Sequence, residues 1–298
     1  MTTPSDEEIM ERFRSLTIWS KGGQRAPHKP LLCLLAISKL TSLDARLLPF
    51  RVIEKPLHDL LTEFGPPRKV CHPEYPFWAL QHDKDVWECQ TNFPPSKPSN
   101  GYPTKASLIR SDAQGGFLPD IYQALRTRQE LRSRVIVELL NSHFPETVQE
   151  DILEALGLST TPTVPKSNDR DSEFRNKVLS AYEYRCAVCG FNVRIGNVVV
   201  ALEAAHIKWH QAGGPDIQEN GLSLCSLHHK LFDRGAFTVD ADWCIVVSER
   251  AYGSEGFIEH LGRFHRKPIL RPNRESYKPQ IDYLQWHLSQ VFLPPSRE

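Results

Sequence analysis

Hydrophobic and polar positions in the first half of the chain predict several helices. The segment 5–8 (Ser-Asp-Glu-Glu) is a capping box, in which the first and last side chains satisfy each other's backbone amides, so we expect a helix from here to about Leu16. A second helix is expected to begin at Pro30, because seven apolar residues follow it directly. Helical spacing returns in residues 119–142 and 146–157.

Two other segments have compositions that do not favour helices. Residues 66–103 are rich in proline and aromatic residues, which favours strands and ordered loops. Residues 159–170 combine two prolines and several hydroxyl side chains with no apolar periodicity, which is typical of a linker. We therefore expect an N-terminal domain over residues 1–158, a linker over 159–170 and a C-terminal domain over 171–298.

The C-terminal domain is predicted to mix short strands with helices. A helix over 171–182 is followed by a cysteine-containing knuckle, a strand over 198–207, a loop, and a short helix from about Leu224. Strands over 237–240 and 245–248 come next. The expected fold class is α+β, with a mixed α/β N-terminal domain followed by a smaller C-terminal domain.

The sequence predicts neither a membrane segment nor a secretory signal. The longest apolar run, Leu31–Ile37, has seven residues, whereas a membrane helix needs about 20. Residues 6–8 are all acidic, where a signal peptide would have a basic region followed by an apolar stretch. We therefore expect the protein to lie in the cytoplasm.

The charge of the chain is balanced overall but not locally. It has 36 basic and 36 acidic residues, and a neutral sum taken alone argues against a nucleic-acid partner, because such domains are usually basic. However, residues 11–142 hold 19 basic and 13 acidic residues, a net charge of +6, and residues 263–278 hold six basic residues and one acid. The neutral sum therefore does not exclude DNA, but it limits how tightly unspecific DNA is expected to bind.

Cysteine spacing indicates a metal site. The chain has seven cysteines, and an odd number without a secretory signal argues against a disulfide framework. Cys186 and Cys189 form a C-x₂-C pair that ends at Gly190, and Cys225 and His228 form a second pair with the same gap. Two such pairs match the four ligands of a closed tetrahedral Zn²⁺ site, so we expect a structural zinc that staples the C-terminal domain.

A motif lies between and around these two pairs, in the stretches Leu202-Glu203-Ala204-Ala205-His206, Asn220-Gly221, His228-His229 and Phe232-Asp233-Arg234-Gly235. With these stretches, residues 180–245 closely resemble the HNH, or ββα-metal, nuclease family. The resemblance implies a ββα-metal fold stapled by the zinc and an endodeoxyribonuclease activity. It places the family's first histidine at His206, its asparagine at Asn220 and its last histidine at His229.

Phosphodiester hydrolysis at neutral pH needs a base for water and a cation for the developing charge. His206 is the expected general base, since the pKa of imidazole suits this role, and Glu203 is expected to hold its ring in the working tautomer. His229 and Asp233 stand at i and i+4 on the short helix, so we expect them to share one divalent ion, Mg²⁺ or Mn²⁺.

Other residues near the motif have less direct predicted roles. Asn220 is expected to fix the loop between strand and helix rather than to touch substrate. Ala205 departs from the pattern of many family members, which place a metal-binding Asp or His immediately before the base. Trp209 and His210 are expected to be packing and surface residues.

A second resemblance lies in the N-terminal domain. The stretches 25–32 (Arg-Ala-Pro-His-Lys-Pro-Leu-Leu) and 75–80 (Tyr-Pro-Phe-Trp-Ala-Leu) resemble the sulfur-binding domain of phosphorothioated-DNA-dependent restriction endonucleases. The order of sulfur reader, linker and HNH domain is also that of McrA-type members. A pocket of proline ring, aromatic face and methyl group suits sulfur, which accepts hydrogen bonds poorly. The resemblance spans residues 10–155 and implies these DNA- and sulfur-binding residues: Arg25, Pro27, His28, Lys29, Tyr75, Pro76 and Ala79.

The sequence therefore predicts a modification-dependent (type IV) restriction endonuclease that binds phosphorothioate-modified double-stranded DNA. Because one HNH site cuts one strand at a time, double-strand cleavage predicts a homodimer or paired binding. Two alternatives stay open. One is an HNH endonuclease directed to 5-methylcytosine, with Trp78, Trp87 and Phe93 as aromatic walls. The other is a non-catalytic, zinc-containing DNA-binding regulator.

Overall fold

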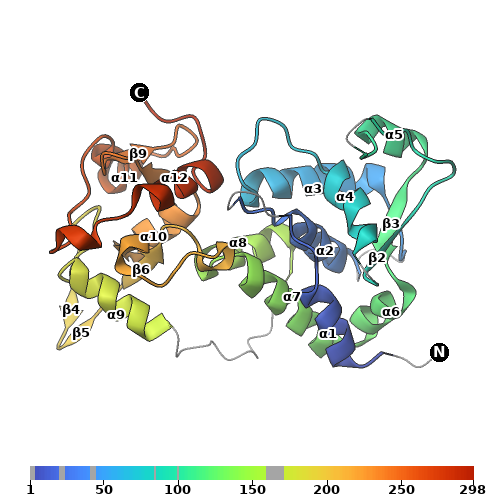
Figure 1. Cartoon of the computed structure of the whole chain (residues 1–298), viewed down its shortest axis with the longest axis horizontal. Coiled ribbons are helices and arrows are strands. Elements are labelled where there is room, and N and C mark those ends of the chain that lie inside the picture. The colour runs from blue at the N-terminus through green and yellow to red at the C-terminus, as the bar shows by residue number, and fades with distance from the viewer. Residues whose placement is uncertain (1–3, 20–23, 41–44, 84, 99–100, 159–170) are drawn as a thin grey trace. The chain divides into compact units, whose positions relative to one another are not determined.

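The computed structural model describes residues 4–19, 24–40, 45–83, 85–98, 101–158 and 171–298 (Figure 1). The predicted linker over residues 159–170 lies outside the described residues. Contacts divide the described chain into two compact units. The N-terminal unit contains the described residues of 1–20, 26–144 and 149–164, and the C-terminal unit contains those of 21–25, 145–148 and 165–298.

Helix α2 (His28–Lys39) forms the centre of the N-terminal unit. Its residues from Pro30 to Ile37 are all buried, and it packs against α3 (Phe50–Phe64), α4 (Glu74–Ala79) and α7 (Gln129–His143). An apolar helix without a polar face is buried on most sides, as the run of seven apolar residues predicts. The other helices of this part are α1 (Asp6–Arg14), α5 (Lys105–Arg110) and α6 (Pro119–Thr127), together with α8 (Glu146–Leu156) from Gln149 onward, since residues 145–148 belong to the C-terminal unit.

A small antiparallel sheet completes the N-terminal unit. Its strand order is β1 (Leu48–Pro49), β3 (Gln114–Phe117) and β2 (Trp87–Gln90). A Cβ atom on Gly115 of the central strand would lie 2.9 Å from the rings of both Phe77 and Trp87. The missing side chain therefore lets these two rings pack edge to face over the sheet.

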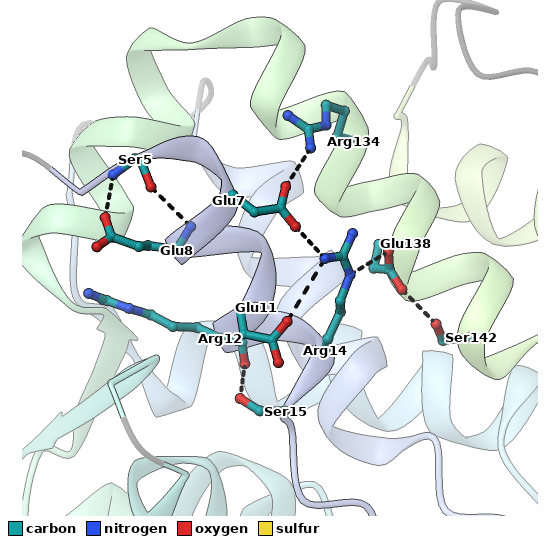
Figure 2. Close-up of polar contacts among 10 residues, drawn as sticks. All are labelled: Ser5, Glu7, Glu8, Glu11, Arg12, Arg14, Ser15, Arg134, Glu138 and Ser142. Carbon is teal, nitrogen blue, oxygen red and sulfur yellow. Dashed lines mark hydrogen bonds and ion pairs between the residues drawn. The ribbon is translucent and has the colours of Figure 1, made fainter.

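Figure 2 shows how polar side chains fix α1. The predicted capping box is confirmed: Ser5 accepts from the Glu8 backbone amide, and the Glu8 carboxylate accepts from that of Ser5. Arg14, near the end of α1, pairs with Glu7 on its own helix and with Glu138 of α7, whose Oε2 lies 3.1 Å from the arginine Nε. These half-exposed pairs orient α1 on α7 and contribute less than the buried apolar contacts beneath them.

One prediction for the N-terminal domain is wrong. The segment 66–103 contains helix α4, followed by the 3₁₀ helix η1 (Leu80–His82), although strand β2 also falls within it as predicted. Its prolines do not oppose the helix, because Pro73 is the N-cap and Pro76 lies in the first turn, where no intrahelical amide donor is lost. The predicted helix over 119–142 is also divided, as α6 and α7 meet at Arg128.

The C-terminal unit is built around a ββα motif. Strands β6 (Leu202–His206) and β7 (Gly221–Cys225) pair antiparallel, and helix α10 (Ser226–Asp233) follows β7 directly (Figure 1). The predicted strand over 198–207 is interrupted at Ala201, whose φ is +52°, so that β5 (Val198–Val199) pairs instead with β4 (Arg194–Ile195). The remaining elements are α9 (Asp171–Ala181), β8 (Phe237–Val239), β9 (Ile245–Val247), α11 (Glu255–His260) and α12 (Ile281–Gln290).

Helix α9 packs closely on the β6–β7 pair. Gly221 lies opposite His206 in the register, and a Cβ atom there would lie 2.4 Å from a methyl carbon of Val178. Glycine thus allows α9 to approach the end of the strand that carries His206. Phe174 and Val178 of α9 are buried in the core of this unit.

Within the described residues, no helix is both long and apolar enough to cross a membrane.

Candidate functional site

The four predicted zinc ligands converge. The ligand atoms of Cys186, Cys189, Cys225 and His228 all lie within 4.8 Å of one another. The first two come from the turn after α9, Cys225 ends β7 and His228 lies in the first turn of α10. Three thiols and one imidazole match a closed structural Zn²⁺ site, so the residues present fit the expected ion.

The orientation of His228 also suits a metal ligand. Its Nε2 lies 2.8 Å from the backbone carbonyl of His260 at the end of α11, so Nε2 donates the proton. Nδ1 then faces the thiols, 3.1 Å from the Sγ of Cys225. Metal-binding histidines usually donate their other ring N–H in this way. No sequence signal marks His260, since its backbone oxygen makes the contact.

His206 lies at the end of β6, with its ring stacked on Phe174 of α9. The ring centroids are 3.9 Å apart and the planes meet at 14°. Its Nε2 lies 2.8 Å from Oδ1 of Asp216, a loop residue that the sequence analysis does not single out. The carboxylate accepts this hydrogen bond, which places the proton on Nε2 and the lone pair on Nδ1.

Asn220 holds the loop that presents Asp216. It is fully buried, and its Oδ1 accepts from the Lys208 backbone amide at 2.8 Å. Its Nδ2 donates to the backbone carbonyls of Lys208 and Pro215, both at 3.0 Å. The side chain is thus fully occupied in closing the 208–220 loop.

The structure pairs Glu203 with His229 and not with His206, contrary to the expected role of Glu203. Its Oε2 lies 2.7 Å from the His229 Nδ1, and its Oε1 accepts from the Ser226 hydroxyl. Positions three apart on a strand point to opposite faces, so Glu203 faces α10 while His206 faces α9. Ala205, two residues after Glu203, lies on the same strand face as Glu203.

His229 stands between two carboxylates. Its Nε2 lies 3.1 Å from Oδ2 of Asp233, in addition to the contact of its Nδ1 with Glu203. Burial lowers the pKa of this imidazole, but the charges of Asp233 and Glu203 outweigh burial and raise the pKa to about 10. The hydrogen bond from His229 in turn lowers the pKa of Glu203.

Asp233 is enclosed, with its side chain only 2% exposed. Its Oδ1 accepts from the indole Nε1 of Trp209 at 3.0 Å, and its Oδ2 accepts from the Thr147 hydroxyl. Glu203 is by contrast 41% exposed. The structure therefore brings Glu203, His229 and Asp233 together as a chain of contacts with His229 in the middle.

The predicted sulfur-pocket residues fall mostly on two contacting helices of the N-terminal unit. His28 and Lys29 begin α2, and Tyr75 and Ala79 lie one turn apart on α4, both partly exposed. Pro76 is buried on the inner side of α4, and Pro27 is the buried N-cap of α2.

The polar members of this set already have partners. The Lys29 ammonium lies 2.7 Å from Oδ2 of Asp83, and the Tyr75 ring stacks on His72 at 4.4 Å. Arg25 groups with the C-terminal unit, where its guanidinium lies over the Trp209 ring and its Nε donates to the carbonyl of Gln290.

Comparison with family models shows to which protein family the chain belongs. A family model described as "ScoMcrA-like, DNA sulfur-binding domain" matches residues 6–161, which is more than half of the chain. The chain belongs to this family. A model described as "HNH endonuclease" matches residues 186–240, the segment that contains both metal-ligand pairs and the ββα motif. A sulfur-binding domain is thus followed by an endonuclease domain, and the protein is a nuclease.

Several solved structures are similar to about half of this chain. The sulfur-binding domain of ScoMcrA, solved in complex with phosphorothioated DNA, is 27% identical over 50% of this chain and 94% of its own length, with a TM-score of 0.43. That of SprMcrA, also solved with phosphorothioated DNA, is 21% identical over 52% of this chain and 96% of its own, with a TM-score of 0.43. The type IV phosphorothioation-dependent restriction endonuclease ScoMcrA is 25% identical over 53% of this chain and 30% of its own, with a TM-score of 0.40. No curated protein matches the chain.

Proposed function

We propose that this protein is a type IV restriction endonuclease that binds phosphorothioate-modified double-stranded DNA and hydrolyses its phosphodiester bonds. The observation that carries the proposal is the order of two family matches in one chain, a DNA sulfur-binding domain followed by an HNH endonuclease domain. The first domain supplies a reason for restricting cleavage to marked DNA, and the second supplies the hydrolysis.

His206 acts as the general base in this proposal. Asp216 holds the Nε2 proton, so the lone pair of Nδ1 is the one that takes a proton from the attacking water. Phe174 keeps the ring plane fixed by stacking on it. A base already held in its working tautomer and orientation loses no free energy to reorientation as the proton moves.

We assign Glu203 and His229 to the divalent ion, Mg²⁺ or Mn²⁺, which would take the place of the proton that lies between the His229 Nδ1 and Glu203. Glu203 lies on the same strand face as Ala205, so its longer side chain takes the place of the acid that Ala205 lacks. Asp233 then acts as a positioning residue for His229, since its carboxylate is enclosed by Trp209 and Thr147. A divalent ion held there would neutralise charge on the scissile phosphate.

The sulfur mark is assigned to the surface formed by the start of α2 and the outer face of α4. Tyr75 and Ala79 present an aromatic ring and a methyl group on that face, while Pro27 and Pro76 are buried. The Lys29–Asp83 ion pair leaves little net charge beside this apolar surface. Such a surface favours polarisable sulfur over a strongly hydrated phosphate oxygen.

One of the three aromatic residues that the methylcytosine alternative needs, Trp87, is not accessible to a base. Trp87 is only 3% exposed and packs edge to face on Phe77 and Phe117 in the core. A buried core ring cannot stack on a flipped base.

The proposal is tested with three matched duplexes that carry a phosphorothioate, 5-methylcytosine or neither mark, each incubated with Mg²⁺ or Mn²⁺. We expect binding and cleavage of the sulfur-marked duplex alone, with loss of cleavage but not of binding in His206→Ala. His58→Ala serves as the control, because His58 lies on an exposed part of α3 beside Asp59. Equal cleavage of all three duplexes would contradict the proposed specificity, and binding without cleavage would favour a regulator.

Double-strand cleavage by this protein is proposed to require a homodimer. Each chain has one ββα motif within its described residues, and each motif is assigned to one strand. Sedimentation of the protein with its marked duplex should show two chains per cleaved site. One chain per site, with both strands cut, would rule out this arrangement.

A further inference from the structure

A cluster of two histidines and one aspartate lies on the α9 side of the ββα motif. The ligand atoms of His206, His210 and Asp216 all lie within 4.8 Å of one another, as do those of the cysteine cluster. We propose that these three residues form a further metal site, the second one in the chain selective for Zn²⁺ and similar ions, whose occupancy switches off the nuclease. The binding part of this inference is independent of the proposed function, and the inhibitory part rests on it.

The distances suit a small ion. Oδ1 of Asp216 lies 2.8 Å from the His206 Nε2 and 3.4 Å from the His210 Nδ1. Ligands about 2.0–2.1 Å from tetrahedral zinc are about 3.3–3.4 Å apart, so one contact fits already and the other must open by about half an ångström. The opening is a small movement of Asp216, whose side chain is 44% exposed.

The cluster is held by its surroundings rather than by a mobile loop. His206 is fixed by its stack on Phe174, and the 208–220 loop is closed by the three hydrogen bonds of Asn220. His210 begins the 3₁₀ helix η2 (His210–Ala212), which ends at Gly213 with a φ of +77°. The three side chains are 21%, 63% and 44% exposed in chain order, so an ion reaches them from solvent and keeps water as its remaining ligands.

The donor set determines which ion is expected. Two imidazoles and one carboxylate favour Zn²⁺, Ni²⁺ or Co²⁺ over Mg²⁺, which prefers oxygen ligands and retains its water. The pair assigned to the catalytic ion, Glu203 and His229, lies on the opposite face of β6. The two sites therefore take different ions on different faces of one strand.

An ion bound to this cluster prevents His206 from acting as a base, because it fixes the other tautomer of the imidazole. Neutral imidazole has one N–H and one lone pair, and an ion bound to the His206 Nε2 takes the lone pair of that nitrogen. The single proton then lies on Nδ1, which no longer has a lone pair to accept the proton of water. When the ion binds both residues, the hydrogen bond between the His206 Nε2 and Asp216 is lost.

The first experiment counts metal without DNA. Full-length protein with its structural zinc is dialysed against low micromolar free Zn²⁺, and bound zinc is measured by mass spectrometry. We expect two zinc ions per wild-type chain, and one in His210→Ala and in Asp216→Asn. His58→Ala, which removes an exposed histidine beside a carboxylate but without a second histidine, should keep two. An equal count in wild type and His210→Ala would overturn the site, whatever the nuclease does.

The second experiment measures inhibition. Cleavage of marked duplex with Mn²⁺ is followed against added Zn²⁺, and His210→Ala should cleave normally without zinc but need at least about ten-fold more zinc for half inhibition. An unchanged inhibition curve would contradict the switch. Loss of zinc-free cleavage in His210→Ala would also contradict it, because the cluster would then hold the ion that cleavage needs.

Discussion

Asp216 is the residue on which the assigned base depends most directly. Replacement by asparagine keeps the shape but removes the charge, and the amide can stabilise either tautomer of His206. We expect Asp216→Asn, assayed at very low free zinc, to lower the cleavage rate about 100-fold while binding of marked DNA stays unchanged. A rate within two-fold of wild type would show that Asp216 does not orient the base.

Glu203 is predicted to set the metal requirement. Glu203→Gln keeps the hydrogen-bonding geometry toward Ser226 and His229 but removes the charge that favours a cation. The Mn²⁺ concentration for half-maximal cleavage should rise at least about ten-fold, with partial rescue at high Mn²⁺. Glu183→Gln, which changes an exposed glutamate paired with Arg185, is the control. A lower maximal rate with no change in the Mn²⁺ requirement would assign Glu203 another role.

The sequence best predicts the site residues whose side chains meet because they are close together in the chain. The convergence of Cys186, Cys189, Cys225 and His228 follows from spacing alone, because two pairs with the same short gap are recognised without knowledge of the fold. Glu203 was assigned to the wrong histidine, although strand alternation already separates positions 203 and 206 onto opposite faces. Asp216 could not be predicted, because the closure of a loop by Asn220 brings it to His206.

Helix α12 carries a buried histidine that should make stability depend on pH. His287 is fully buried, stacks on Phe232 and bonds to the Thr238 hydroxyl through Nδ1. Burial is the main cause that lowers its pKa to about 3 in the folded protein. The unfolded chain takes up a proton near pH 6.5 and the folded chain does not, so this histidine's contribution to stability is present above pH 6.5 and is lost as the pH falls toward 3.

The test compares the pH slopes of two proteins rather than their absolute stabilities. As the pH is lowered from 6 to 4.5, the free energy of unfolding should decrease for both proteins. The decrease should be steeper for wild type than for His287→Phe, by about 1.4 kcal/mol per pH unit. Denaturant unfolding of zinc-loaded protein gives both slopes. Parallel slopes would show that His287 is not held neutral.

The sequence predicts an element well when every residue in the element favours the same secondary structure. The α1 capping box and the apolar α2 are of this kind, since both signals are local. The sequence does not predict helix α4, because its proline and aromatic content favours strands, whereas Pro73 and Pro76 occupy positions at which a helix tolerates proline. Composition alone does not show which turn of a helix a proline occupies.

For the whole molecule, removal of the expected structural zinc should separate DNA cleavage from DNA binding. The ligands Cys186, Cys189, Cys225 and His228 all belong to the C-terminal unit, while the core of the N-terminal unit contains none of them. Chelation should therefore unfold the C-terminal unit and abolish cleavage, but leave binding of phosphorothioate duplex within about two-fold of wild type. Protein shown to be zinc-free that still cleaves would contradict a structural role for the site.

The charge distribution of the whole chain is consistent with recognition of DNA through the sulfur mark and not through long-range attraction. A basic body in residues 11–142 is offset by acidic residues elsewhere, so the chain has no net charge. Long-range attraction to the DNA backbone is therefore modest, and discrimination must come from short-range contacts with the mark. Binding to unmarked DNA should accordingly be weak at physiological salt.

The proposed dependence of cleavage on sulfur in the DNA backbone can be measured by a competition in one tube. Two duplexes of identical sequence, one with a phosphorothioate and one with ordinary phosphates, carry different labels and are cut together by the full-length protein with Mn²⁺. We expect the sulfur-marked duplex to be cut while its unmarked partner stays intact, and we expect His206→Ala to cut neither. Loss of both duplexes at the same rate would contradict this dependence.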